Sequence, residues 1–267
     1  MSGDLGAEVV VRAAAEALEV YKHLDLILVG DEHELKGHVS GIVGSEPRLR
    51  IQHASEVVGM SEAPADALRK KKDSSMRVAI NLVKSGDADA CVSAGNTGAL
   101  MATAKFVLKM LPGIDRPAII TELPALGGSL HMLDLGANTQ GSAEHLFQYA
   151  VMGSIVSSDI LGIERPKVAL LNIGAEDTKG HDTIKDASAL LQESTLTYIC
   201  FIEGSDLFAV KADVVVTDGF TGNLALKTME GTVGRAKHYL SRAFSRNWLT
   251  KLQELLAGPV LRRLARE

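Results

Sequence analysis

DVVVTDGFTGNLALK, residues 213–227, begins as a run of valines and ends as a helix-forming segment. Continuous apolar runs of this length are typical of strands buried on both faces of a sheet. The second half carries apolar residues at helical spacing, and Gly, Thr and Asn separate the halves. SAGNTGALMA, residues 93–102, repeats the pattern after the apolar run ADACV. A strand that runs through a short loop into a helix is the building unit of α/β folds.

Apolar runs and amphipathic segments alternate along the whole chain. Helical periodicity predicts helices at 7–21, 31–40, 74–86, 97–111, 141–161, 183–193 and 222–245. Apolar runs predict strands at 24–30, 48–54, 88–95, 118–124, 131–136, 167–174, 198–204 and 213–219. This alternation indicates an α/β fold with a doubly wound, mostly parallel sheet covered by helices on both faces.

The segments 118–124 and 131–136 depart from the parallel pattern. Only a few residues, two of them glycines, separate these segments. A parallel crossover needs a dozen or more residues, so we expect an antiparallel hairpin and therefore a mixed sheet. We expect a single two-lobed α/β domain over 1–267, with a seam between the lobes somewhere in 110–160.

Composition excludes several classes of protein. The chain is 46% hydrophobic and 23% charged, as in ordinary globular proteins, and no apolar run approaches the roughly 20 residues that cross a bilayer. Cys91 and Cys200 lie in apolar runs, which favours structural thiols in a reducing cytoplasm over a disulfide or a metal site. The eight histidines lack metal-ligand spacing, and 4% aromatic content gives nucleic-acid binding little support.

The end of the sequence is strongly basic. Residues 235–267 hold eight Lys or Arg and two Glu, a net charge of +6. Since the whole chain carries −5, the remaining residues carry −11. We expect a basic amphipathic helical tip there, which suits contact with an anionic membrane or a dimer-forming hairpin. The candidate membrane-contacting side chains are Phe244, Trp248, Leu249 and Leu255.

Five loops of similar composition follow predicted strands: SAGNTG (93–98), DLGANTQG (134–141), NIGAEDTKG (172–180), IEGSD (202–206) and TDGFTGN (217–223). In open α/β sheets ligands bind at the carboxyl ends of the strands, and helix N-termini attract anions. Each loop alone is also typical of an ordinary turn or helix cap. Five such loops at one sheet edge predict an anion-binding cleft.

The anion is predicted to be a small phosphate. The sequence has neither GxxxxGK[ST] nor GxGxxG after a strand, which argues against a whole nucleotide. Lys179, in a polar loop, is the candidate for charge neutralisation. Lys227 is a further candidate, with a solvated helix face as the alternative interpretation. The candidate phosphate-binding residues are Ser93, Gly95, Asn96, Thr97, Gly98, Asn138, Thr221, Gly222 and Lys227.

These motifs together resemble one family. KKDSSMRVAINLVKSGDADACVSAGNTGALMA (71–102), LDLGAN (133–138), NIGAEDTKG (172–180), FIEGSD (201–206) and DVVVTDGFTGNLALKTMEG (213–231) resemble the PlsX-type phosphate acyltransferases of bacterial phospholipid synthesis. The resemblance covers nearly the whole chain. It implies a fold similar to phosphotransacetylases and isocitrate dehydrogenase-like enzymes. Family members usually begin with a strand and continue beyond this C-terminus, so we expect the chain to lack an N-terminal strand and a C-terminal segment.

The resemblance also implies an activity and partners. Such enzymes are homodimers that transfer a long-chain acyl group from acyl carrier protein to inorganic phosphate. They are cytosolic but associate peripherally with the membrane, and a glycerol-3-phosphate acyltransferase then uses the acyl phosphate. No metal or organic cofactor is implied.

The chemistry requires phosphate held beside a thioester carbonyl and a stabilised oxyanion. Phosphate is itself the nucleophile, so no enzymic serine or cysteine is needed. The catalytic candidates are Lys179 for charge, Asn223 for orientation and Asp218 for holding these groups in place. Two alternatives remain: a phosphotransacetylase acting on coenzyme A thioesters, and a non-catalytic scaffold that binds carrier protein at the membrane.

Overall fold

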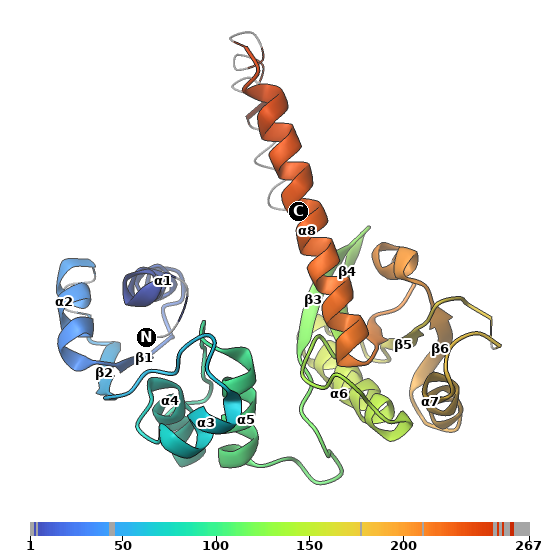
Figure 1. The fold of residues 1–267 in the computed structure, drawn as a ribbon, viewed down its shortest axis with the longest axis horizontal. Helices are drawn as coiled ribbons and strands as arrows, with labels where there is room; N and C mark the ends of the chain where they lie inside the picture. Colours follow the sequence, from blue (N-terminus) through green and yellow to red (C-terminus); the bar gives the residue numbers. More distant parts are fainter. Residues whose placement is uncertain are drawn as a thin grey trace. The chain divides into compact units, whose positions relative to one another are not determined.

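The chain folds into two compact units, Met1–Pro112 and Gly113–Glu267, and their boundary falls within the stretch 110–160. Figure 1 colours the first unit from blue to green and the second from green to red. The computed structural model describes residues 3, 5–42, 46–176, 178–209, 211–247, 250, 253, 257 and 258.

The first unit combines a small parallel sheet with helices. Its elements are α1 (Gly6–Val20), β1 (Leu26–Gly30), α2 (Glu32–Ile42), β2 (Leu49–His53), α3 (Pro64–Lys70), α4 (Ser75–Ser85) and α5 (Thr97–Leu108). β1 and β2 pair in parallel, and their apolar side chains pack with those of α1 and α2. A separate core beneath α3, α4 and α5 contains Met76, Ile80, Ala99 and Val107. The sequence prediction missed α3.

The predicted strand at 88–95 is wrong. These residues have no strand assignment, and the Val92 side chain is 97% exposed. A strand exists only where a neighbour pairs with its backbone N–H and C=O groups. Among the described residues, no strand pairs with 88–95, so the apolar run ADACV remains an irregular segment that leads into α5.

The second unit is built on a five-stranded mixed sheet with the strand order β3-β4-β7-β5-β6. Its elements are β3 (Ile120–Ala125), β4 (Gly128–Leu133), α6 (Ala143–Leu161), β5 (Lys167–Leu171), α7 (Asp182–Gln192), β6 (Thr197–Ile202), the 3₁₀ helix η1 (Gly204–Phe208), β7 (Val214–Val216) and α8 (Gly219–Phe244). β3 and β4 are antiparallel, which confirms the predicted hairpin. β4, β7, β5 and β6 run parallel to one another. The sequence prediction missed η1.

Successive side chains of β7, the central strand, pack into two different hydrophobic cores. Val214 and Val216 pack with α6 and α7 on one face of the sheet. Val215 packs on the other face with η1 and with the first turns of α8. All three valines are fully buried, because both faces of the sheet are covered. Burial on both faces explains why this strand is continuously apolar rather than alternating.

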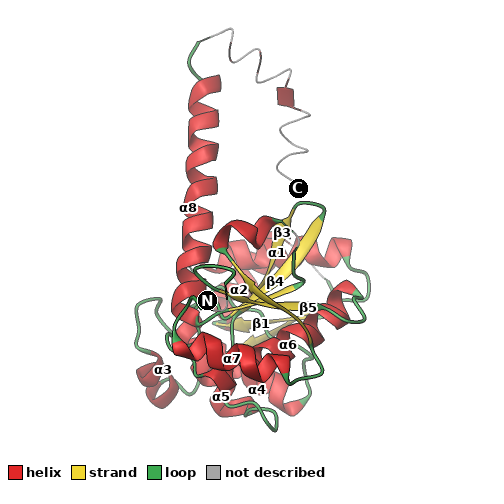
Figure 2. Ribbon diagram, turned by 90° about the vertical axis from the view of Figure 1, so that its right-hand side faces the viewer, coloured by secondary structure: helices red, strands yellow, loops and turns green. Residues whose placement is uncertain are grey.

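Most of α8 lies outside the core. Its buried residues are Gly219 and Gly222, and residues 231–243 are exposed. In Figures 1 and 2 the helix extends well beyond the sheet of its own unit. Phe244, the last residue of α8, is partly exposed, whereas Trp248, Leu249 and Leu255 lie outside the described residues. Among the described helices, none has the length and apolar content to span a membrane.

Candidate active site

Four of the five glycine-containing loops lie at one edge of the second unit's sheet. They follow β4, β7, β5 and β6, which are adjacent and parallel, so their carboxyl ends share that edge. Because β7 lies between β4 and β5, the 217–223 loop stands between the 134–141 loop and the 172–180 loop. The sequence prediction of converging loops is confirmed for these four. SAGNTG belongs to the first unit.

Asp134, the residue after β4, organises its own loop. The side chain is completely buried. Oδ1 accepts hydrogen bonds from the backbone N–H groups of Ile119 (3.0 Å), Gly136 (3.2 Å) and Ala137 (2.9 Å). Oδ2 accepts from the backbone N–H (2.8 Å) and the side-chain Nδ2 (3.0 Å) of Asn138. Five donors therefore compensate the buried negative charge.

These hydrogen bonds point the backbone N–H groups of the loop toward the Asp134 carboxylate. The N–H groups of residues 136–138 donate to Asp134, and those hydrogen bonds keep them from a bound anion. The side-chain amide of Asn138 donates to Asp134 and to the carbonyl of Pro117 at 2.7 Å. Since an amide nitrogen carries two hydrogens, both are in use. Asn138 thus braces the loop in this structure, and its contact with substrate stays a prediction.

The first turn of α8 packs directly onto the Asp134 loop. Gly219 N–H donates to the carbonyl of Asn138 at 2.9 Å. A Cβ at Gly219 would lie 2.5 Å from that carbonyl oxygen, and one at Gly222 would lie 1.9 Å from the carbonyl oxygen of Asp134. Contacts under 3.0 Å require something to move, and here the obstacle is backbone. The glycines of DGFTGN therefore allow a close approach between helix and loop.

Asp218 and Thr221 are joined by two hydrogen bonds at the start of α8. Asp218 is the N-cap residue, and its Oδ1 accepts from Thr221 N–H at 2.9 Å. Its Oδ2 accepts from the Thr221 hydroxyl at 2.9 Å. Asn223, two residues further on, is exposed, and its Cβ lies 3.4 Å from where a Cβ on Gly136 would be. Of the predicted residues in this motif, Asn223 presents its side chain most openly.

Lys179 folds across its own loop. A Cβ at Gly174 would lie 2.4 Å from Lys179 Cδ, so the glycine makes room for the lysine side chain. Lys179 Nζ forms an ion pair with Glu176 Oε1 at 2.9 Å, and about half of each side chain is exposed. The hydrogen bond to Glu176, together with the charges of Glu176 and Glu203, raises the pKa of Lys179. Lys179 is therefore a fully protonated cation at neutral pH.

The loop around Lys179 is fixed by Asn172. Asn172 Nδ2 donates to the carbonyl of Lys179 at 3.1 Å, and Oδ1 accepts from Ile173 N–H at 2.9 Å. Gly180 has a φ of +89°, and a Cβ there would lie 2.4 Å from Asn172 Oδ1. The asparagine at the end of β5 thus fixes the backbone that carries the lysine.

Lys227 lies on an exposed surface of α8. Its Nζ pairs with Glu230 Oε2 at 2.8 Å, and the side chains are 63% and 54% exposed. Pairs this exposed contribute on the order of 0–1 kcal/mol to stability. The geometry favours the alternative interpretation from sequence, a solvated helix face, while a contact with phosphate stays a prediction.

In the first unit, Asn96 of SAGNTG connects two loops. Its Oδ1 caps α5 by accepting from Ala99 N–H at 3.0 Å. Its Nδ2 donates to the carbonyls of Met60 (2.8 Å) and Glu62 (2.9 Å), with a longer contact to Gly59. These bonds use the hydrogen-bonding atoms that the sequence analysis assigned to phosphate. The observed role of Asn96 is structural, and phosphate binding by it stays a prediction.

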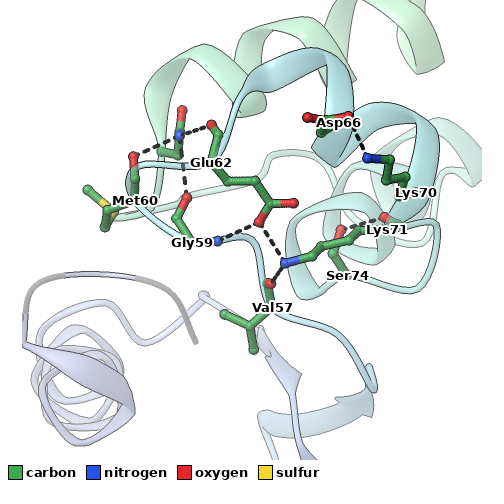
Figure 3. A network of polar contacts seen from close by, with 9 residues as sticks. Val57, Gly59, Met60, Glu62, Asp66, Lys70, Lys71 and Ser74 are labelled. Carbon is green, nitrogen blue, oxygen red and sulfur yellow. Dashed lines mark hydrogen bonds and ion pairs between the residues drawn. The ribbon is translucent and has the colours of Figure 1, made fainter.

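The 57–62 loop that Asn96 contacts is itself held by an ion pair. Glu62 Oε2 accepts from Gly59 N–H at 3.0 Å and from Lys71 Nζ at 2.6 Å, as Figure 3 shows. The hydrogen bond from Lys71 lowers the pKa of the Glu62 carboxyl. Lys71 Nζ also donates to the carbonyl of Val57, and Ser74 Oγ donates to that of Lys71. This network connects the 57–62 loop to the residues between α3 and α4.

The remaining SAGNTG candidates differ in exposure. Ser93 Oγ accepts from Gly95 N–H at 3.2 Å, and Gly95 is buried. Thr97 and Gly98 are exposed at the start of α5. A Cβ on Gly98 would meet Pro64 at 3.0 Å, so this glycine allows α5 to approach α3. Thr97 is therefore the member of the motif whose side chain is best placed to meet a ligand.

Sequence reasoning missed Tyr149 on α6. Its side chain is completely buried, and its hydroxyl is the one buried side-chain polar atom without a hydrogen-bond partner in the described part of the chain. Burial and the charge of Asp134 raise its pKa to about 12, although Arg116 and Asn138 act in the opposite direction. Tyr149 lies within the predicted helix 141–161, but no local motif indicated a position near Asp134.

The described residues contain no group of three His, Cys, Asp or Glu side chains that could hold a metal ion. Cys91 and Cys200 are not joined in a disulfide, and both residues are partly buried. Burial raises the pKa of the Cys91 thiol.

Comparison with known proteins supplies a further set of observations. A family model described as "Fatty acid synthesis protein" matches residues 1–267. A phosphate acyltransferase of Halorhodospira halophila is 54% identical over 268 residues, which cover 100% of this chain and 78% of that protein. A phosphate acyltransferase of Nitrosococcus oceani is 56% identical over 265 residues, covering 98% of this chain and 77% of that protein.

Two solved structures resemble the chain in fold. The EutD phosphotransacetylase from Staphylococcus aureus matches with a TM-score of 0.60 at 20% identity, over 85% of this chain and 79% of its own. A branched-chain phosphotransacylase from Enterococcus faecalis V583 matches with a TM-score of 0.58 at 17% identity, over 85% of this chain and 82% of its own. These likenesses confirm the predicted α/β fold, similar to that of phosphotransacetylases.

Proposed function

The chain belongs to the fatty acid synthesis protein family and is a phosphate acyltransferase, and on that premise we propose that acyl carrier protein is its acyl donor. The enzyme transfers a long-chain fatty acyl group from this carrier to inorganic phosphate. The acyl phosphate then serves a glycerol-3-phosphate acyltransferase in phosphatidic acid synthesis. The observation that supports a phosphate site is the loop order at the sheet edge. It places the Asp134-braced start of α8 beside the loop of Lys179.

The reaction needs only a positioned nucleophile and a stabilised oxyanion. A phosphate oxygen attacks the thioester carbonyl carbon and forms a new C–O bond. The tetrahedral intermediate then collapses, the C–S bond breaks, and the carrier leaves as a thiol once a proton from phosphate or solvent has reached the sulfur. Atoms and electrons balance without an oxidant, a reductant or a covalent enzyme intermediate.

We assign roles to three residues at the sheet edge. Lys179, protonated at neutral pH, neutralises phosphate charge or the developing oxyanion. Asn223, exposed at the first turn of α8, orients phosphate through its side-chain amide. Asp218 acts through Thr221 to fix that turn. Bound phosphate would take the place of Glu176 as the partner of Lys179.

Lys179→Ala should lower the rate of acyl phosphate formation by well over tenfold, because a transition-state charge contact is lost. The measurement is acyl phosphate formed from palmitoyl-carrier protein and radiolabelled phosphate. Lys36→Ala is the matched control, since Lys36 also forms an exposed ion pair with a nearby Glu, here Glu32 within α2 of the first unit. Near-normal turnover of Lys179→Ala would remove the lysine from the mechanism.

The same assay distinguishes the rival functions. The long-chain proposal expects acyl phosphate from palmitoyl-carrier protein and little product from acetyl-coenzyme A. The opposite preference would identify a phosphotransacetylase. Binding of carrier protein without product from either donor would identify a scaffold.

We further propose that the enzyme is a homodimer that contacts anionic membranes peripherally. The exposed part of α8 carries the apolar side chains Val233, Tyr239 and Leu240, which suit a partner surface. Residues 235–267 combine net positive charge with Leu, Phe and Trp, a composition that suits the membrane interface.

Leu249→Glu or Leu255→Glu should release most of the protein from vesicles that contain anionic lipid. A carboxylate would oppose both apolar insertion and attraction to the lipid charge. Cosedimentation with the vesicles measures the bound fraction, and Val9→Glu, at an exposed apolar position of α1, is the control. Unchanged binding of both leucine variants would count against membrane contact by this segment.

A further inference from the structure

One face of the first unit places positive charge around an exposed aromatic ring. Phe106 on α5 is 53% exposed. Arg77 Cζ, from α4, lies 5.3 Å from the centre of its ring, and Lys109 Nζ lies 4.9 Å from it. Lys84 follows Arg77 by seven residues, two helical turns, so it extends the same side of α4. We call Arg77, Lys84, Phe106 and Lys109 the α4–α5 basic face.

Within the described part of the chain, the cations of this face are not paired with carboxylates. Among the ion pairs of the described residues, none includes Arg77, Lys84 or Lys109. The neighbouring lysines behave differently, because Lys70 pairs with Asp66 and Lys71 with Glu62 (Figure 3). Two cations close to one ring repel each other, and cation–π attraction at exposed sites offsets that only in part. The α4–α5 basic face can therefore bind an anionic group of another molecule.

We propose that the α4–α5 basic face is the docking surface for the acyl carrier protein, an inference that rests on the proposed function. Its ligand is an acidic helix that places Asp or Glu side chains against Arg77 and Lys109 and an apolar side chain against Phe106. Since residues 235–267 carry +6, the rest of the chain carries −11, so the cations of the α4–α5 basic face stand in a part of the chain that is otherwise acidic on balance. Complementary charge in one place then determines where the partner binds and how fast it arrives.

The composition of the face favours a protein partner over lipid. Membrane-binding helices present a broad apolar stripe with several large side chains. Here one phenyl ring stands among cations, with its π-face engaged by them. Phe and Arg are enriched at protein interfaces, where a central anchor is surrounded by polar contacts.

The test is the charge reversal Arg77→Glu/Lys109→Glu in the full chain. The control is Lys22→Glu/Arg50→Glu, which reverses two exposed charges elsewhere in the same unit. Binding of fluorescently labelled holo-carrier protein is measured by anisotropy at low and high salt. In parallel, KM and kcat are measured with palmitoyl-carrier protein at saturating phosphate. We expect the test variant to raise Kd and KM about tenfold at low salt, with kcat unchanged and the control like wild type.

Each other outcome has a defined meaning. Unchanged Kd and KM in the test variant, or equal effects of test and control, would overturn the docking surface. A fall in kcat at unchanged Kd would assign the two residues to the chemistry instead, and loss of anionic-vesicle binding at unchanged carrier affinity would identify a lipid surface. If wild type binds carrier protein through this face but makes no acyl phosphate, the proposed function fails and the docking surface stands.

Discussion

Gly222→Ala is expected to lower the free energy of unfolding by about 3 kcal/mol and to reduce acyl phosphate formation more than a hundredfold. The added Cβ would lie 1.9 Å from the carbonyl oxygen of Asp134 and 3.0 Å from Thr217 Cγ2. Asp134 follows β4 and Thr217 follows β7; both are buried, and backbone hydrogen bonds join the two strand ends, so neither can move independently. The first turn of α8 must therefore shift, and Asn223 shifts with it.

The same helix supplies a matched control for this substitution. Gly234 lies in the exposed part of α8, where an added Cβ would meet nothing within 4 Å. Gly234→Ala should stabilise the helix by roughly 0.5–1 kcal/mol, because alanine loses less conformational entropy than glycine. Urea unfolding followed by circular dichroism gives both free energies. Similar effects of the two substitutions would show that close packing of α8 on the Asp134 loop is not what position 222 requires.

Asp134→Ala is expected to cost roughly 4 kcal/mol of stability and to abolish measurable turnover. Removal of the carboxylate leaves four backbone N–H groups and the Asn138 amide without their acceptor in a fully buried position. Buried donors that lose a partner carry the whole desolvation penalty, and the loop must open to reach water.

Asp134→Asn separates packing from charge at this position. Asparagine keeps the volume of the side chain and one acceptor oxygen, but its amide hydrogens would face the donors of Asn138. We expect an intermediate loss of stability and a kcat still lowered more than tenfold. Glu230→Ala removes a carboxylate from an exposed pair and should change stability by less than about 1 kcal/mol. Wild-type kcat in the folded Asn variant would contradict a positioning role for the carboxylate.

The sequence predicted most secondary structure elements because their periodicity reflects burial. Val214–Val216 is buried on both faces and reads as a continuous apolar run. The short separation between β3 and β4 predicted their antiparallel pairing, which the structure confirms. The run at 88–95 reads the same way, yet it forms no strand in the described residues. An apolar run indicates a propensity to form a strand, whereas an actual strand also requires a neighbouring strand with which its backbone can pair.

The sequence predicted that loops would meet at one sheet edge, which the structure confirms for four of them, but it did not predict the contacts of their residues. Glycine and asparagine in DGFTGN and SAGNTG suggested phosphate contact. The structure shows Gly222 permitting helix packing and Asn96 bonding to carbonyls more than thirty residues earlier in the chain. Such roles depend on long-range contacts that no local pattern encodes. In the sequence Asp134 is only the first residue of the 134–141 loop, because its five donors come together only once the backbone is folded.

The position of β7 has a consequence for how the second unit forms during synthesis. β3 and β4 leave the ribosome early, and β5 and β6 follow as a second pair, but the strand that joins the two pairs is made last. Until Val214–Val216 emerges, β4 and β5 each present an unpaired inner edge, a state prone to intermolecular pairing. A chain that ended before residue 213 would therefore leave the inner edges of β4 and β5 unpaired, a state that favours aggregation.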